Sequence, residues 1–174
     1  MTYLGEDPFA LPVDQRDPAR RLRGRLASPV TVWTTVGEDG APAGITVGSI
    51  VIAEGQPPVA VGLIDSLSFF WESLTVSKRF VIHVLEHPHR RLADQMAGRY
   101  PGPDARFENL ELSSSEWGPV INDVPNRAYC RFSGFVEVAD SLAVKGDIDR
   151  MEFSDIENPL VHFRGSYHDL TPRT

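Results

Sequence analysis

The chain has 174 residues, of which 41% are hydrophobic and 24% are charged. These values are typical of one globular domain, and they exclude global disorder. The 17 Lys and Arg residues against 24 Asp and Glu residues give a formal net charge of −7. Because an acidic chain has no general attraction to nucleic acids or anionic lipids, we expect neither nucleic acid nor a membrane among its partners.

The single cysteine, Cys130, cannot form an internal disulfide or a cysteine-rich zinc site. The first residues carry acids and prolines where a secretory signal would be apolar, and no 18 apolar residues follow one another. These features predict a cytoplasmic protein. We expect residues 1–16 to form an N-terminal arm and residues 17–174 to form one domain.

The chain starts its regular structure with a short helix. Asp17 and Pro18 are typical of the N-cap and first position of a helix, which we expect to end near Leu26. Five arginines fall between positions 16 and 25. They are interpreted either as a phosphate-binding patch or as a solvated helix face, and the second is favoured in an acidic protein.

Most of the remaining chain is predicted to be β-structure. Stretches rich in β-branched and aromatic residues, or alternating in polarity, predict strands over residues 29–36, 41–53, 59–64, 80–85, 130–138, 142–148 and 159–167. Short helices are predicted over residues 68–77 and 88–99, and residues 100–126 are predicted to be a loop that covers a site. Strands joined mostly by hairpins favour a closed or nearly closed antiparallel barrel with a few short helices.

The strand over residues 130–138 shows a clear alternation. Cys130 shares one parity of this strand with Phe132, Val136 and Val138. Cys130 is therefore expected to be a small core residue and not a nucleophile. A tight turn over residues 139–141 is predicted to join this strand to the next one in a long hairpin.

The sequence contains no glycine-rich phosphate-binding motif and no Gly-x-Ser-x-Gly motif. His83, His87 and His89 lie close together, but Pro88 interrupts the helix that would align them. We expect no metal site. The residues alone thus predict a β protein with a loop-covered cavity, and they assign no reaction to it.

Residues 45–64, which read ITVGSIVIAEGQPPVAVGLI, resemble the flavin reductase-like family of FMN-binding split barrels. In that family a Thr-x-x-Ser stretch precedes a Pro-Pro that opens a central strand. Segments similar to FVIHVL (residues 80–85) and PLVHFRGSY (residues 159–167) follow in the same order. The resemblance extends over about residues 20–170, and it implies a mainly β, antiparallel split barrel that forms a homodimer.

The resemblance places the flavin ring and ribityl chain along one strand. The residues implied are Thr46, Val47, Gly48 and Ser49. Gly48 has no Cβ, which would let a planar ligand approach the main chain closely. The alternative is that these residues are ordinary strand hydroxyls beside a bulge.

The resemblance also implies that the turn after the central strand holds the flavin phosphate. The further candidate cofactor-binding residues are Asp65, Ser66, Ser68, Trp71, His83 and Arg164. Ser68 opens a helix, so it would bind an anion or serve as a plain N-cap. Trp71 would line the flavin edge or pack in the interior, and Arg164 would bind a phosphate or a carboxylate. His83 stands where the family frequently has Asn.

Two departures from the family pattern affect the expected site. Ile52 and Glu54 replace serines that usually follow the Thr-x-x-Ser stretch. The hairpin turn of the family, Gly-Asp-His, reads Ala139-Asp140-Ser141 here. Asp140 and Ser141 are therefore candidate dinucleotide-binding residues with a weakened nicotinamide contact, unless Ser141 serves the turn alone.

The family implies an enzyme in which the cofactor carries the chemistry. A flavin, FMN or alternatively FAD, would accept hydride at N5 from NADH or NADPH, so no catalytic side chain is expected. A partner monooxygenase is one candidate acceptor of the reduced flavin. The alternatives are a flavin-binding protein without efficient turnover and a split barrel that has lost flavin.

Overall fold

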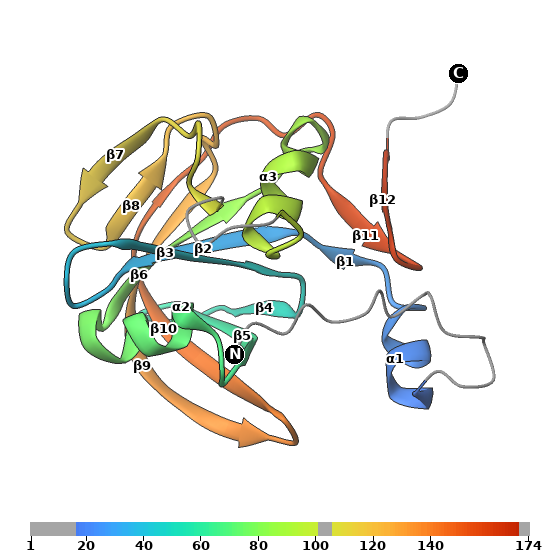
Figure 1. Ribbon diagram of the computed structural model, residues 1–174, viewed down its shortest axis with the longest axis horizontal. Helices are drawn as coiled ribbons and strands as arrows, with labels where there is room; N and C mark the ends of the chain where they lie inside the picture. The colour runs from blue at the N-terminus through green and yellow to red at the C-terminus, as the bar shows by residue number, and fades with distance from the viewer. Residues whose placement is uncertain (1–16, 101–105, 171–174) are drawn as a thin grey trace.

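The computed structural model describes residues 17–100 and 106–170, and the predicted arm of residues 1–16 lies outside them. The main element is a seven-stranded sheet. Its strands are β2 (Thr31–Val36), β3 (Pro42–Val47), β4 (Ile50–Ala53), β5 (Val59–Asp65), β6 (Arg79–Val84), β9 (Arg127–Val138) and β10 (Ser141–Glu152). They pair in the order β3-β2-β6-β9-β10-β5-β4, and every adjacent pair is antiparallel (Figure 1).

Two small antiparallel sheets and a few short helices surround the large sheet. The small sheets are β1 (Ser28–Pro29) with β11 (Val161–Phe163) and β12 (Ser166–His168), and β7 (Leu112–Ser115) with β8 (Gly118–Ile121). The helices are α1 (Pro18–Arg23), α2 (Phe69–Ser77), the 3-10 turn η2 (His87–His89) and α3 (Arg90–Met96). Within the described residues, no helix has the length and apolar character that crossing a bilayer demands.

The mainly β, antiparallel fold with short helices is confirmed. The sheet curves strongly and brings β5 close to the end of β3. A Cβ at Gly62 of β5 would lie only 3.3 Å from Cγ1 of Val47 in β3. Among the described strand pairs, no ladder joins the edge strands β3 and β4. The closed barrel therefore stays a prediction.

Aromatic rings fill the concave side of the curved sheet. Trp33 and Phe80 stack with their centroids 4.9 Å apart, and Phe70 meets both rings edge-on. All three side chains are fully buried. A Cβ at Gly62 would lie 2.7 Å from the Trp33 ring, and one at Gly146 would overlap the Phe80 ring. These two glycines are needed because the rings pack directly on the main chain of β5 and β10.

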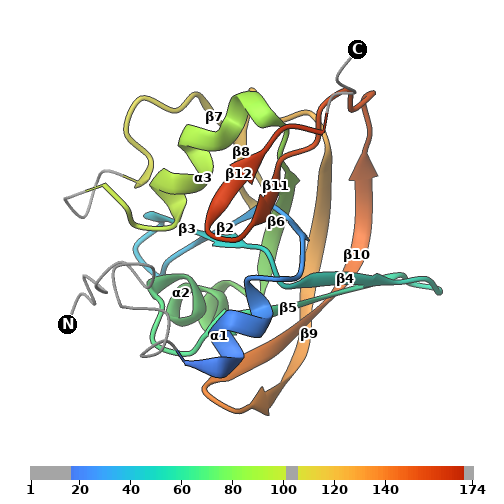
Figure 2. The same ribbon diagram turned by 90° about the vertical axis from the view of Figure 1, so that its right-hand side faces the viewer.

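A second apolar cluster attaches α3 to the sheet. Leu92 and Met96, one helical turn apart on α3, pack with Val30, Leu85 and Leu160. Figure 2 shows the β11/β12 hairpin beside α3. This cluster fixes the positions of α3 and the small β1-β11-β12 sheet next to the end of β3.

The strand β9 contains a β-bulge. Lys145 pairs with Gly134, whereas the next residue, Gly146, pairs with Phe132. Ser133 is thus an extra residue in β9, and the alternation of side chains along the strand is inverted from this point.

The bulge corrects the expected faces of β9. Cys130 is fully buried, as predicted, but Val136 and Val138 are 54% and 46% exposed. Phe135 lies on the face of the buried Val144, with which it pairs, and its ring contacts Trp71, but it is itself 44% exposed. The prediction of one shared face was wrong because strict alternation does not anticipate an inserted residue.

The predicted loop over residues 100–126 contains β7 and β8, so the loop prediction was wrong for this hairpin. All of β8 is buried, and the Thr34 hydroxyl of β2 donates to the carbonyl of Pro119 over 2.6 Å. The hairpin packs on β2 because its short second strand is apolar. Residues 101–105 of this segment lie outside the described residues.

The closing segment forms two strands where one was predicted. Arg164 and Gly165 lie between β11 and β12 with φ values of 51° and 84°. Positive φ at two successive positions is typical of a two-residue hairpin turn. The chain therefore reverses at this point.

We predict that Gly146→Ala lowers the free energy of unfolding by about 1 to 3 kcal/mol, because the added methyl group would force the Phe80 ring out of its stack with Trp33. Urea unfolding measures this change. Gly55→Ala is the matched control, since its Cβ would meet no other heavy atom closer than 3.4 Å. Equal losses in the two variants would contradict the packing argument.

Candidate functional site

Residues 46–49 lie where β3 ends and the chain crosses to β4. The Thr46 hydroxyl donates to the carbonyl of Ala93 in α3 over 2.6 Å. The Ser49 carbonyl accepts from the amide of Leu63 in β5 over 3.0 Å, and the Ser49 residue is exposed. This polar edge, residues 46–49, thus extends from α3 to β5 and reaches solvent at Ser49.

Gly48 is placed by its contact with β1. A Cβ at this position would lie 3.2 Å from Oγ of Ser28 and 3.3 Å from the carbonyl oxygen of Pro29. The preceding residue, Val47, is buried, and its carbonyl accepts from the Thr31 hydroxyl. The close approach of β1 therefore explains why a glycine stands at position 48 without any ligand. The role of Gly48 toward a planar ligand stays a prediction.

The turn after β5 lies beside the tip of the β9/β10 hairpin. Asp65 and Ser141 are paired residues, and Asp140 is exposed at the tip. Leu63, whose amide binds Ser49, precedes Asp65 on the same strand. Ser49 and Asp65 therefore lie near the candidate dinucleotide residues Asp140 and Ser141, at the end of β5.

Polar atoms of this turn are engaged in local bonds. The Asp65 carboxylate accepts from the Leu67 amide, and the Ser68 hydroxyl donates to the Asp65 carbonyl over 2.7 Å. The same hydroxyl accepts from the Trp71 amide, as an N-cap does. Ser66 is exposed. The bonds fit the alternative role of Ser68 as a cap.

Trp71 lies on α2 next to the β9/β10 hairpin. Its ring meets Phe132 and Phe135 edge-on, with centroids 5.8 and 5.0 Å apart. Trp71 is half-buried in these contacts. The packing role considered for this residue accounts for its position.

His83 lies away from the polar edge. It is fully buried in β6, where Nε2 accepts from the amide of Ile121 and Nδ1 bonds to the carbonyl of Val32. Since an amide can only donate, Nε2 carries a lone pair and Nδ1 carries the proton. Both nitrogens are occupied by main chain, so we leave His83 out of the proposed cofactor site.

Arg164 lies at the turn between β11 and β12, away from the turn that carries Asp65 and Ser68. It is exposed, and its guanidinium lies 5.3 Å from the centroid of the Phe163 ring. Its amide donates to the carbonyl of Gly24 at the end of α1. In the described chain, no carboxylate lies within 4.0 Å of its guanidinium, which leaves it available to an anion.

The cysteine and the histidines are not arranged as a reactive or metal-binding group. Burial raises the pKa of the Cys130 thiol, which therefore stays protonated. His89 accepts from the Glu86 amide through Nδ1. No three His, Cys, Asp or Glu side chains of residues 17–100 and 106–170 are close enough together to hold a metal ion.

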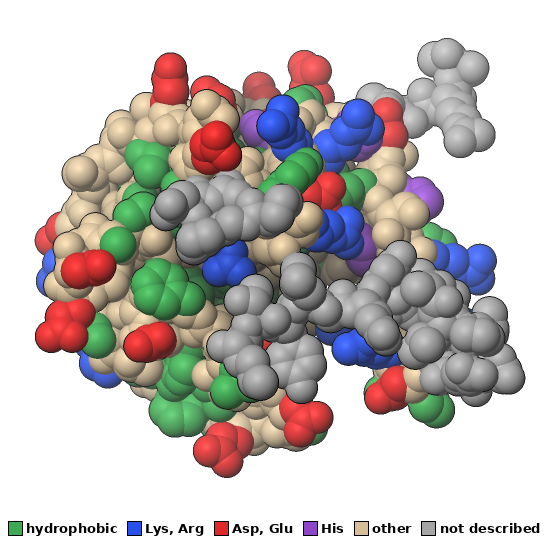
Figure 3. Space-filling model, viewed as in Figure 1, with side chains coloured by type: hydrophobic (Ala, Val, Ile, Leu, Met, Phe, Trp, Pro, Cys, Tyr) green, Lys and Arg blue, Asp and Glu red, His purple; other side chains and the backbone are tan. Residues whose placement is uncertain are grey.

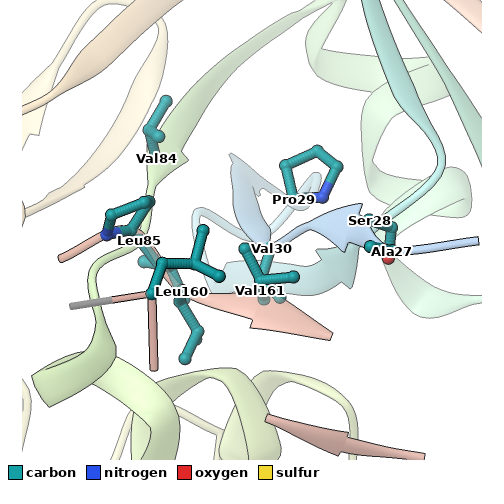
Figure 4. Close-up of a pocket in the computed structure, with 10 residues that line it drawn as sticks. Ala27, Ser28, Pro29, Val30, Val84, Leu85, Leu160 and Val161 are labelled. Carbon is teal, nitrogen blue, oxygen red and sulfur yellow. The ribbon is translucent and has the colours of Figure 1, made fainter. Parts of the chain in front are cut away.

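An apolar groove of about 250 Å³ lies beside the polar edge (Figure 4). Ser28 and Pro29 of β1, which contact Gly48, form one part of its lining, with Val84 and Val161 on other parts. Ligand pockets usually have about 300 to 1,000 Å³. The groove is thus too small to enclose a flavin nucleotide by itself.

Ser28 and His162 lie near the polar edge and were not predicted. They pair across β1 and β11, and Ser28 contacts the Cα region of Gly48. The alternation of Val161, His162 and Phe163 in the closing segment was the available signal, because it points His162 to the side opposite Val161. A strand of two residues, β1, gives no pattern from which its partner could be predicted.

Comparison with known proteins defines the class of this architecture. The nitrilotriacetate monooxygenase component B homologue of Mycobacterium thermoresistibile superposes with a TM-score of 0.80 at 25% identity, covering 93% of this chain and 92% of that chain. "Flavin reductase (NADH)" of Kitasatospora aureofaciens is 29% identical over 92% of this chain and 88% of its own length. The NADH:riboflavin 5'-phosphate oxidoreductase of Streptomyces pristinaespiralis is 28% identical, covering 98% and 97%.

These similarities define an antiparallel β protein of the flavin reductase type. The family model of the flavin reductase like domain matches residues 23–171. The chain belongs to the flavin reductase-like family.

We predict that His83 makes the protein lose stability as the pH falls below about 6.5. Burial lowers the pKa of His83 from 6.5 to about 3, with a smaller lowering by the Arg127 charge opposed by the bond to Val32. Between these two pKa values, His83 binds a proton in the unfolded chain but stays neutral in the folded chain. The contribution of His83 to the free energy of unfolding is fully present above pH 6.5. It falls by about 1.4 kcal/mol per pH unit below that pH, or by about 2 kcal/mol at pH 5.

Urea unfolding between pH 7.5 and 4.5 tests this prediction. His83→Asn removes the titrating ring and should reduce the pH dependence to the part that His162, whose pKa is also lowered by burial, contributes, although it lowers the stability at pH 7.5. His168→Asn is the control, since His168 is exposed and should keep the wild-type dependence. Parallel curves for wild type and His83→Asn would contradict the role of His83.

Proposed function

We propose that the protein is an NAD(P)H-dependent flavin reductase that binds FMN along the polar edge. The family match over residues 23–171 carries this proposal. Two similar proteins are named for NADH, and one of them for riboflavin 5'-phosphate, which is FMN. FAD stays the alternative cofactor. We also propose that residues 17–174 form one domain and that the protein acts in the cytoplasm.

The residues of the polar edge suit a flavin. Ser49 is exposed, and its hydroxyl has no hydrogen-bond partner among the described residues, so it can bind a ligand that lies along the edge. The Thr46 hydroxyl gives its proton to Ala93 and keeps lone pairs that can accept. Both groups orient a ring against the strand end, where the bound flavin would supply the hydride acceptor.

The dinucleotide is proposed to approach from the β9/β10 hairpin, past Asp140 and Ser141. Ser141 is half-buried against the turn that carries Asp65. A serine side chain is short and has no ring to stack on a nicotinamide, so we expect weak saturation by NADH. Similarity to a monooxygenase component B homologue supports a partner monooxygenase as the acceptor of the reduced flavin.

The visible spectrum of the purified protein tests the proposed function. We predict flavin bands after incubation with FMN and gel filtration, and bleaching of these bands when NADH or NADPH is added without oxygen. Stable flavin bands that no dinucleotide bleaches would favour a binding protein without turnover. A protein that retains neither FMN nor FAD would contradict the proposal.

We further propose a homodimer that covers the outer face of the sheet. This apolar face carries Val51 of β4, Leu63 of β5, and Val136 and Val138 of β9, which are 44% to 65% exposed. Leu63 and Val136 both pair with Ala143, so they lie on one face, and Leu63 borders Ser49. A patch of this kind typically marks an interface.

The run of Phe69, Phe70 and Trp71 in the sequence predicts apolar surface for a dimer. This prediction is wrong for Phe70, which is fully buried in the core, whereas Phe69 is 47% exposed. The bulged strand β9, through Val136 and Val138, provides the larger exposed surface.

We predict that Val136→Asp converts a dimer into a monomer at micromolar concentration, because the new carboxylate would be buried in the interface without a partner. Light scattering gives the mass. Val76→Asp on α2 is the control, since Val76 is 53% exposed on another element. A wild type that is monomeric with flavin bound would refute the shared interface.

A further inference from the structure

Positive charge gathers beside the polar edge in a protein whose net charge is −7. Arg23 of α1 and Arg99 after α3 lie near His162 of β11, and Arg164 lies at the turn of the same hairpin with its guanidinium over Phe163; we call these four residues the cationic cluster. Arg99 and Arg23 both act electrostatically on His162, and the Arg164 amide is bonded to Gly24 beside Arg23. In the view of Figure 3, most of the visible Lys and Arg side chains lie in the half of the molecule that contains α3 and the β11/β12 hairpin.

Two chains of contacts join the cationic cluster to the polar edge. Gly48 lies against Ser28, and Ser28 is paired with His162, so His162 is one strand beyond the edge. On the other side Thr46 is bonded to Ala93, and the next residue, Asp94, binds Arg99 over 2.8 Å. His162 and Arg99 of the cluster therefore lie close to residues 46–48.

The charges of the cluster are only partly balanced. Asp94 is bonded to Arg99 and also accepts from the Tyr167 hydroxyl over 3.0 Å. Arg23 and Arg164 are exposed, and among residues 17–100 and 106–170 no carboxylate lies within 4.0 Å of either guanidinium. Arginines without carboxylate partners are suited to bind phosphate through two parallel N–H bonds.

His162 responds to the field of the cluster. Partial burial lowers its pKa, and the charges of Arg99, Arg23 and His168 lower it further, against an opposing effect of Asp94. The ring is therefore neutral at pH 7 and offers one N–H donor. A field that disfavours a second positive charge favours an anion at the same place.

The other end of the polar edge has the opposite character. Asp65 is the last residue of β5, and Asp140 lies at the tip of the neighbouring hairpin. The hydroxyl of Ser68 is already occupied by two bonds within the turn. A phosphoryl group placed there would face carboxylates, whereas at the cationic cluster it would face guanidinium groups.

We propose that Arg23 and Arg164, supported by Arg99 and His162, bind a phosphoryl group of the nucleotide that occupies the polar edge. The inference rests on the proposed flavin reductase function. The group would be the phosphate of the flavin or the pyrophosphate of the dinucleotide, which share the same chemistry. It would lie at the end of the polar edge that is farther from the turn of Asp65 to Ser68. The family resemblance instead places the flavin phosphate at that turn.

The double variant Arg23→Gln, Arg164→Gln tests the proposal, because both side chains are exposed and their replacement leaves the core unchanged. Fluorescence quenching gives its affinities for FMN and for riboflavin, which lacks the phosphate. Stopped-flow reduction of bound flavin gives the apparent constant for NADH. We expect a loss of about tenfold for the ligand whose phosphoryl group is bound, as for a charge-assisted hydrogen bond.

The arms of the experiment separate the two sources. A loss of FMN affinity with unchanged riboflavin affinity supports the proposal and assigns the cluster to the flavin phosphate. Unchanged affinities for both flavins with a weaker apparent NADH constant support it and assign the cluster to the dinucleotide. Equal losses for FMN and riboflavin, or no change in any constant, would overturn it.

Arg79→Gln is the matched control, because Arg79 is an exposed arginine at the far end of β6, where it pairs with Glu116. A loss in this variant as large as in the double variant would overturn the proposal in favour of a long-range effect of net charge. A wild type that binds neither flavin nor NADH would overturn the proposed function and this inference with it. A wild type that is reduced by NADH, with all constants retained in the double variant, would overturn the inference alone.

Discussion

The stack of Trp33 on Phe80 sets the curvature on which the rest of the molecule depends. Both rings pack against main chain, because Gly62 and Gly146 have no side chains at the points of contact. The sheet can therefore curve until the end of β3 reaches β5 near Val47. The polar edge therefore lies where β3 passes β5, and the bond from the Leu63 amide to the Ser49 carbonyl continues the β4–β5 ladder beside it.

The polar edge combines rigid support with an asymmetric charge. It is attached to α3 at Thr46, to β1 at Gly48 and to β5 at Ser49, so three elements fix its position. Arginines lie near its first end, and Asp65 and Asp140 lie near its second end. An elongated ligand with one anionic end would bind here in one direction only, because reversal would bring its charge against the carboxylates.

Much of the fold could be predicted from local pattern. The hairpins, the buried strands and the N-caps Asp17 and Ser68 depend on short-range signals such as alternation and capping hydroxyls. The reversal at Arg164 and the bulge at Ser133 could not be predicted, since each depends on backbone angles or pairing that alternation does not encode. Both misses lie where tertiary contacts override the local pattern.

The candidate site was predictable to a smaller extent. The residues of the polar edge were identified through family resemblance, and the structure brings them together with Asp65 and Ser141. The resemblance also selected His83, whose surroundings show it bonded to main chain on both sides. The cationic cluster depends on the pairing of β1 with β11, far apart in sequence, so the arginines of α1 could be counted but not located.

The bulge at Ser133 gives β9 two different roles along its length. Before the bulge, Cys130 and Phe132 contribute to the interior of one chain, and after it, Val136 and Val138 contribute to the exterior. Deleting Ser133 would leave the faces of both halves unchanged, because Phe132 would still pair with Gly146, and Gly134 with Lys145. A change of one residue in the length of β9 at this point could thus be absorbed without moving Val136 and Val138 off the outer face, a route by which relatives of one fold could differ in strand length and keep the same exterior.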